Sequence, residues 1–195
     1  HNSLMKYSAK DEWHKGNYKL QSNAVEASFP DGTQQIIFQT TEAGFATEDA
    51  IRALLNWYNS ETEVHTLIKV ASFVYDFLSV HPFQDGNGRL SRLISTLLLL
   101  KNGYKWIQYV SFEHEIENRK NEYYQVLRSC QAQRPHEDVT VWIQFFLNCL
   151  SNIQSQLLTK LQKTGMETQL SPKEKSIYSI IQNRPNIQSG KIAEK

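Results

Sequence analysis

The sequence is poor in cysteine, glycine and proline. Its 195 residues include 2 Cys, 8 Gly and 5 Pro. So few glycines and prolines leave few points at which a helix must end, and we therefore expect helices to dominate the fold. The cysteines, Cys130 and Cys149, do not have the spacing of a zinc site or of a disulfide framework, which favours a reducing, cytoplasmic location.

Long hydrophobic runs and an excess of one charge are also missing. The longest stretch of low polarity, residues 93–100, spans eight residues, whereas a helix that crosses a membrane needs about 20. Lys and Arg number 21 against 20 Asp and Glu, which leaves a net charge of +1. This balance excludes the strongly basic surface of a nucleic-acid coat and the strongly acidic surface of a solvating tail. We expect a globular protein with no membrane association.

One segment carries a β pattern. Residues 25–29 and 35–39 are rich in β-prone side chains and flank the turn sequence Pro30-Asp31-Gly32-Thr33. This arrangement predicts a β-hairpin over 25–39. No other segment carries a clear strand signal, so the predicted fold class is all-α, mainly helical, with one short hairpin.

Apolar residues recur at helical spacing from Thr47 onward, and Thr47 itself is the expected N-cap of the first long helix. The leucines that follow Gly88 are apolar on most sides of their helix, which predicts a position at the centre of the core. The predicted helices cover residues 47–59, 64–78, 88–102, 111–134 and 139–163.

The C-terminal region has a different composition. The sequence becomes polar from Thr164, and Ser171 with Glu174 forms a capping box with Pro172 at the first helical position. These residues predict a helix to about residue 182, followed by the start of another helix at 189–195. We therefore divide the chain into a main domain, 1–163, a linker, 164–170, and a partial second domain, 171–195.

The segment between the second and third long helices carries the chemistry. Gly86 and Gly88 allow backbone conformations that turn successive N–H groups inward, and the helix that begins beside them adds the positive end of its dipole. Such a loop is typical of an anion site. Arg89 and Arg92 are three residues apart on the first turn of that helix, so both can bind phosphates. The pattern indicates a polyphosphate ligand.

Two further residues of this loop can take part in a reaction. Asp85 is placed to hold Mg²⁺, an ion that usually takes one or two carboxylates and fills its other positions with water and phosphate oxygens. Histidine ordinarily titrates near neutrality, so His81 could accept a proton from an incoming hydroxyl. Taken singly, these residues are also typical of turns, helix caps and solvated surfaces; their combination favours a site. A Walker-type phosphate loop and an H-E-x-x-H zinc motif are both missing.

Residues 81–92 match H-x-F-x-[DE]-G-N-G-R-x-x-R, the signature of the Fic family, at every specified position. The chain also resembles Fic proteins that carry a C-terminal winged helix-turn-helix, in Trp57-Tyr58-Asn59, Gly103-Tyr104 and Glu122-Tyr123-Tyr124. The resemblance covers residues 16–163. It implies that 1–163 is a Fic catalytic domain, that the hairpin is the family's flap, and that 171–195 begins a winged helix-turn-helix.

The resemblance implies an activity and a role for each motif residue. Fic enzymes mostly transfer AMP from ATP to a Ser, Thr or Tyr hydroxyl of a target protein and release pyrophosphate. By motif position, His81 is the general base and Asp85 holds Mg²⁺. The N–H groups of Gly86, Asn87 and Gly88, with the Asn87 side chain, stabilise charge at the α-phosphate. Arg89 grips the phosphates, Arg92 binds the γ-phosphate, and Phe83 anchors the loop in the core.

The resemblance also implies partners. The flap would bind the target by adding it as an extra strand, through Val25, Glu26, Ala27, Ile36, Ile37 and Phe38. A homodimer is compatible with this family, and DNA binding would depend on the part of the winged domain beyond Lys195. We expect ATP and a protein target with a hydroxyl side chain as the main partners.

Many Fic proteins are inhibited by a helix bearing [ST]-x-x-x-E-[GN], whose Glu pairs with the second motif arginine, here Arg92. Ser8, Ser22 and Ser111 each precede a Glu at the right distance, but the residue after that Glu never fits. The chain begins at His1 without a leader, and we expect the inhibitory helix to lie upstream. Arg92 is then expected to lack a partner carboxylate, which would leave this chain deregulated.

Two other functions stay open. The motif does not specify the nucleotide, so the chain could transfer a group from another nucleotide or donate the γ-phosphate of ATP. The intact Arg92 favours a triphosphate. A function of a different class is DNA-binding regulation, with the Fic domain as a nucleotide sensor.

Overall fold

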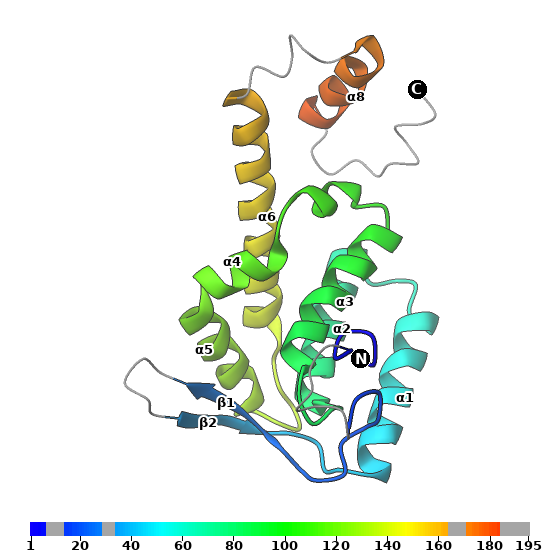
Figure 1. Ribbon diagram of the computed structural model, residues 1–195, viewed down its shortest axis with the longest axis vertical. Coiled ribbons are helices and arrows are strands. Elements are labelled where there is room, and N and C mark those ends of the chain that lie inside the picture. The colour runs from blue at the N-terminus through cyan, green and yellow to red at the C-terminus, as the bar shows by residue number, and fades with distance from the viewer. Residues whose placement is uncertain (7–13, 29–33, 164–170, 184–195) are drawn as a thin grey trace.

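The computed structural model describes residues 1–6, 14–28, 34–163 and 171–183, and it confirms the mainly helical architecture. The helices that precede residue 164 pack as a bundle with a pair of strands at one end (Figure 1). The helices are α1 (Phe45–Ser60), α2 (Thr66–Val80), α3 (Asn87–Lys101), the 3₁₀ helix η2 (Lys105–Tyr109), α4 (Phe112–Asn118), α5 (Lys120–Gln131), α6 (Thr140–Lys163) and α8 (Pro172–Asn183). Among the described residues, no helix is both long enough and apolar enough to cross a membrane.

The two strands, β1 (Ala24–Ser28) and β2 (Gln34–Gln39), pair antiparallel. Ala24 lies opposite Gln39, and the register shifts between Val25 and Glu26. The strands match the range 25–39 for which the sequence predicts a hairpin, except that β1 begins one residue earlier, and β2 contacts α5. The expected turn at 30–33 lies outside the described residues.

Helix α2 is buried on two faces, because it lies between two clusters of apolar side chains. Val70, Val74 and Leu78 face the larger cluster, which includes the aromatic residues of α6. Phe73 and Phe77 face a smaller cluster that α1 completes. The indole N–H of Trp142 on α6 donates a hydrogen bond to the Ala71 carbonyl over 2.8 Å. The C-terminal end of α2 is therefore fixed from both sides.

The prediction that α3 lies at the centre of the core is wrong for most of its leucines, although Leu99 is buried. Leu93 and Leu97 are 54% and 59% exposed. The buried side of this helix is a stripe with a spacing of four residues that consists of Asn87, Ser91, Ser95 and Leu99. Small side chains let α3 approach α2 closely, and both serine hydroxyls donate to carbonyls within their own turn of α3. Most of the leucines are consequently left partly or wholly exposed.

The single helix predicted over 111–134 is two helices, α4 and α5, with a break at Arg119. Neither Gly nor Pro marks this break in the sequence. The break lets both helices pack on α6, and it places the buried Glu115 where Asn152 of α6 donates to its carboxylate over 3.0 Å. Tertiary packing overrides the local helical pattern here.

The ends of two helices test the capping predictions. Helix α1 begins at Phe45 after Gly44, whose φ is 79°, so Thr47 is not its N-cap. Thr47 is buried instead, and its hydroxyl donates to the Glu42 carbonyl over 2.6 Å. At α8 the capping box is confirmed, because the Ser171 N–H donates to the Glu174 carboxylate over 2.8 Å and the Glu174 N–H donates to Ser171 Oγ. Residues 184–195, where the winged domain is expected to continue, lie outside the described residues.

Candidate active site

The motif loop joins the C-terminal end of α2 to the N-terminal end of α3. His81 is the residue at which α2 ends, and its backbone is left-handed, with φ 52° and ψ 60°. Its N–H still donates to the Phe77 carbonyl over 3.0 Å. Left-handed backbone is uncommon for a residue with a side chain. The loop thus sets the direction of the His81 side chain through an unusual backbone conformation.

The Asn87 side chain closes the loop internally. The Phe83 N–H donates to Asn87 Oδ1 over 2.9 Å, and Asn87 Nδ2 donates to the Phe83 carbonyl over 2.6 Å. Asn87 is 1% exposed. The resemblance implies that the Asn87 side chain lies at the α-phosphate, but here both of its polar atoms bind Phe83, so a phosphate would meet only the backbone of Asn87. Phe83 packs in the smaller core cluster, as expected of an anchor.

Gly86 and Gly88 leave space for a ligand to approach the N-terminal end of α3. Gly86 has a φ of 81°, which favours glycine, and it directly precedes this 15-residue helix. A Cβ atom on Gly88 would lie 3.3 Å from the Arg92 guanidinium, and one on Gly86 would lie 3.7 Å from that of Arg89. Both guanidinium groups therefore lie beside the loop, as the motif spacing predicts. The helix dipole and the two cations favour an anion at this point.

Arg92 has a carboxylate partner, which overturns the expectation that it has none. Its Nη2 and Nε donate to Oε1 of Glu113 on α4 over 2.9 Å and 3.2 Å. Glu113 is not part of an [ST]-x-x-x-E-[GN] motif. A phosphate that binds Arg92 must therefore compete with this carboxylate.

Asp85 offers one carboxylate at the mouth of the loop. Its side chain is 45% exposed; Oδ1 accepts from the Gly86 N–H, and Oδ2 lies 3.5 Å from Arg89. In the part of the chain that the structure describes, no three His, Cys, Asp or Glu side chains gather as a metal-ligand cluster. A single accessible carboxylate beside an anion site fits Mg²⁺, which takes most of its ligands from water and substrate phosphates.

The His81 imidazole is held as a neutral base. Its pKa is lowered to about 4, chiefly by burial and also by the charge of Lys19, although the Leu78 carbonyl and Asp85 act in the opposite direction. Nδ1 lies 3.3 Å from the Leu78 carbonyl. A carbonyl can only accept, so Nδ1 carries the proton and Nε2 has the free lone pair. Nε2 is therefore the atom that can take a proton at neutral pH.

Several residues that contact this loop could not be identified from the sequence. The His1 ring stacks on Phe83 with centroids 4.0 Å apart, and its Nε2 lies 2.9 Å from the Asp85 carbonyl. Met5 is fully buried against Gly86 and Arg89. Lys19, Asn23 and Glu113 also contact residues at the ends of α2 and α3 or in the loop between them. These residues contact partners 21 to 84 positions away, so no short motif could have revealed them.

The expected flap residues are described only by their backbone. Val25 pairs with Phe38 and Glu26 pairs with Ile36. The side chains of residues 25–38 lie outside the described part of the structure. Their contact with a target stays a prediction.

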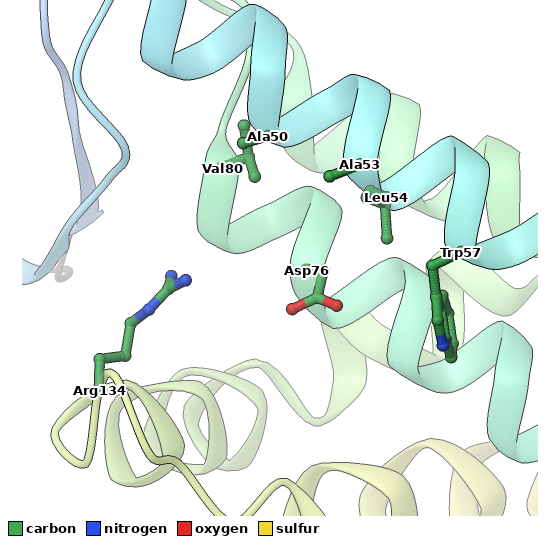
Figure 2. Close-up of a pocket in the computed structure, with 7 residues that line it drawn as sticks. All are labelled: Ala50, Ala53, Leu54, Trp57, Asp76, Val80 and Arg134. Carbon is green, nitrogen blue, oxygen red and sulfur yellow. The ribbon is translucent and has the colours of Figure 1, made fainter.

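A separate pocket of about 280 Å³ lies between α1, α2 and the connection that follows α5 (Figure 2). Asp76 projects into it from α2, opposite Arg134 and beside the indole of Trp57. Burial raises the pKa of Asp76 to about 6. None of the predicted site residues lines this pocket, and Val80 is the lining residue that lies nearest to them in the sequence.

Comparisons with known sequences identify relatives of the motif region. The sequence model of the Fic/DOC family matches residues 1–99. The chain is 34% identical over 59 residues to a probable protein adenylyltransferase of Aquifex aeolicus (strain VF5), a match that covers 30% of this chain and 18% of that protein. It is 30% identical over 95 residues to the protein adenylyltransferase Fic of Drosophila yakuba, a match that covers 48% of this chain and 17% of that protein. The matches thus span less than a fifth of each of these relatives.

Solved structures extend the similarity to most of the chain. A Fic family protein from Desulfovibrio desulfuricans G20 matches with a TM-score of 0.66 and 26% identity, over 93% of this chain and 50% of that one. A Fic domain containing signaling protein from Bacteroides thetaiotaomicron VPI-5482 matches with a TM-score of 0.51 and 25% identity, over 73% of this chain and 53% of that one. Both contain about as much chain again as the part matched here.

Proposed function

Because this chain belongs to the Fic/DOC family, we propose that it is a protein adenylyltransferase, which transfers AMP from ATP to a Ser, Thr or Tyr hydroxyl of a target protein. The observation that carries the proposal is a complete motif loop with a neutral His81 at one end and two arginines at the other. The names of the relatives from Aquifex and Drosophila support the same reaction.

In the proposed reaction, His81 Nε2 accepts the proton of the target hydroxyl. The hydroxyl oxygen forms a bond to the α-phosphorus, and the bond from that phosphorus to the oxygen bridging the α- and β-phosphates breaks. Pyrophosphate leaves with the bonding electrons. Because His81 is neutral well below pH 7, it needs no prior deprotonation to act as the base.

The anion site would hold the nucleotide during this step. The N–H groups of Gly86, Asn87 and Gly88 would face the charge that develops at the α-phosphate. Arg89 would bind the phosphates near the breaking bond, and Arg92 would bind the γ-phosphate once Glu113 is displaced. Asp85 would hold Mg²⁺, which neutralises charge on the phosphate oxygens when bound.

The strand pair would present the target. An extended target segment could add to β1 or β2 through backbone hydrogen bonds, with Val25 to Ala27 and Ile36 to Phe38 as the contacting residues. Main-chain pairing fixes the register of the target and so places its hydroxyl. Homodimer formation, and DNA binding through a completed C-terminal domain, are further parts of the proposal.

The reaction is tested with ATP labelled at the α-phosphate, with Mg²⁺ and a cell lysate that supplies targets. Label on protein that is lost in His81→Ala and retained in His136→Ala would support AMP transfer, because His136 is an exposed histidine outside the loop. Label that appears only from the γ-phosphate would refute it and indicate a kinase. No label from either position would indicate another nucleotide or a sensor.

A further inference from the structure

Lys19 is a buried lysine with its charge inside the protein. It is 1% exposed, and its ammonium group donates to three oxygens: Thr40 Oγ1 at 2.8 Å, the Val80 carbonyl at 2.9 Å and Asn23 Oδ1 at 3.1 Å. Burial lowers its pKa to about 8. Three donors thus meet three acceptors, which is the full hydrogen-bonding capacity of an ammonium group.

Two of the hydrogen bonds made by Lys19 bracket His81. The ammonium group binds the carbonyl of Val80, the residue before His81, and the Lys19 N–H donates to the carbonyl of Pro82, the residue after it, over 2.9 Å. Between these carbonyls lies the left-handed backbone of His81. Such a conformation costs free energy in a residue with a side chain and persists only when its surroundings hold it. Lys19 holds both sides.

The same group of side chains reaches the base of the strand pair. Asn23 directly precedes β1 and Thr40 directly follows β2. Asn23 Nδ2 donates to the Phe83 carbonyl over 2.9 Å, and the Thr40 hydroxyl donates to the Asn23 carbonyl over 2.7 Å. The residue before β1 and the residue after β2 lie at the same end of the strand pair. Lys19 and Asn23 therefore connect this end to the loop that carries His81.

We propose that Lys19 is a positioning residue, which holds His81 in its left-handed conformation and connects the catalytic loop to the base of the strand pair. This inference rests on the proposed function, because it assigns Lys19 a part in placing the base. A methionine of similar length would fill the same space without the cost of burying a charge. The charge of the Lys19 ammonium group is therefore better explained by the backbone conformation that it imposes on His81 than by side-chain packing.

The test compares Lys19→Met with Lys69→Met. Lys69 is a matched control because its ammonium also donates to a backbone carbonyl, that of Glu61 over 2.6 Å, at the opposite end of α2. Thr40→Val serves as a milder second variant, which removes one of the three acceptors of Lys19 and keeps the charge. For each variant we would measure kcat for AMP transfer, ATP affinity, and the backbone chemical shifts of residues 80–82.

In Lys19→Met we expect kcat to fall by about 10- to 100-fold, because the left-handed conformation of His81 loses the hydrogen bond at Val80 and keeps only the main-chain bond at Pro82. ATP affinity should stay within about twofold, since no phosphate contact is removed. The shifts of residues 80–82 should move in Lys19→Met and, to a smaller degree, in Thr40→Val. Lys69→Met should leave both kcat and these shifts unchanged.

Two results would overturn the role of Lys19. One is unchanged kcat together with unchanged shifts at residues 80–82 in Lys19→Met. The other is an equal loss of kcat in Lys69→Met, which would indicate general destabilisation of α2. If the wild-type chain transfers no AMP, the proposed function fails, while the chemical shifts still decide whether Lys19 holds His81. If Lys19→Met does not fold, kcat and the chemical shifts of residues 80–82 in Thr40→Val decide whether Lys19 holds His81.

Discussion

Replacement of Glu113 by glutamine should strengthen ATP binding, because the Glu113 carboxylate pairs with the Arg92 guanidinium group that would bind the γ-phosphate. The pair is short, with Nη2 and Oε1 separated by 2.9 Å, but Glu113 is 62% exposed and Arg92 22% exposed. Ion pairs of this exposure stabilise by about 0.2–1 kcal/mol. Loss of the competing carboxylate should therefore lower the Kd for ATP by about 1.4- to 5-fold.

The measurement is isothermal titration of ATP at low ionic strength, with steady-state transfer as a second readout. We expect a lower Kd and KM with an unchanged kcat, and a gain that shrinks as salt screens the pair. Glu117→Gln is the matched control, because Glu117 lies on the same helix and pairs with Lys120. Equal ATP affinity in wild type and Glu113→Gln would refute the competition, as would an equal gain in the control.

Three other substitutions test the structure. Asp76→Asn should raise the free energy of unfolding at pH 7 by up to about 3 kcal/mol. Because the folded-state pKa of Asp76 is raised to about 6, wild-type stability falls as pH rises from 4 to 6; urea denaturation at pH 7 and pH 4 should show the gain only at pH 7. Asn87→Ala leaves the Phe83 N–H unpaired and removes one of the two hydrogen bonds to the Phe83 carbonyl, which keeps Asn23 as a partner; it should cost about 2–4 kcal/mol in thermal denaturation, and a cost below 1 kcal/mol would contradict the closed loop. Trp142→Phe removes the hydrogen bond to Ala71 and should cost about 1–3 kcal/mol by the same assay.

The sequence predicted the structure correctly at three places where one short stretch of chain determines it. The motif at 81–92, the capping box at Ser171 and the hydrophobic spacing of α2 each lie within one short stretch of chain, and backbone geometry connects such patterns directly to structure. The structure accordingly places Gly86, Arg89 and Arg92 together at the start of α3.

What the sequence did not reveal depends on distant parts of the chain. Glu113 meets Arg92 only because α4 folds back over α3, and Lys19 meets Val80 across 61 positions. The leucines of α3 led to a wrong prediction for a related reason. Hydrophobicity alone does not tell which face of a helix is buried, and here the buried face of α3 includes serines such as Ser95.

The burial of α2 on both faces has a consequence for amide hydrogen exchange. The N–H groups in the middle of α2 should exchange only when the whole domain unfolds, because no local opening can expose them without breaking both core clusters. Helix α8 is largely exposed, so its amides should exchange through local fraying. His81 would then extend from one of the slowest-exchanging segments of the protein, and motions that admit ATP or a target would belong to the elements around α2.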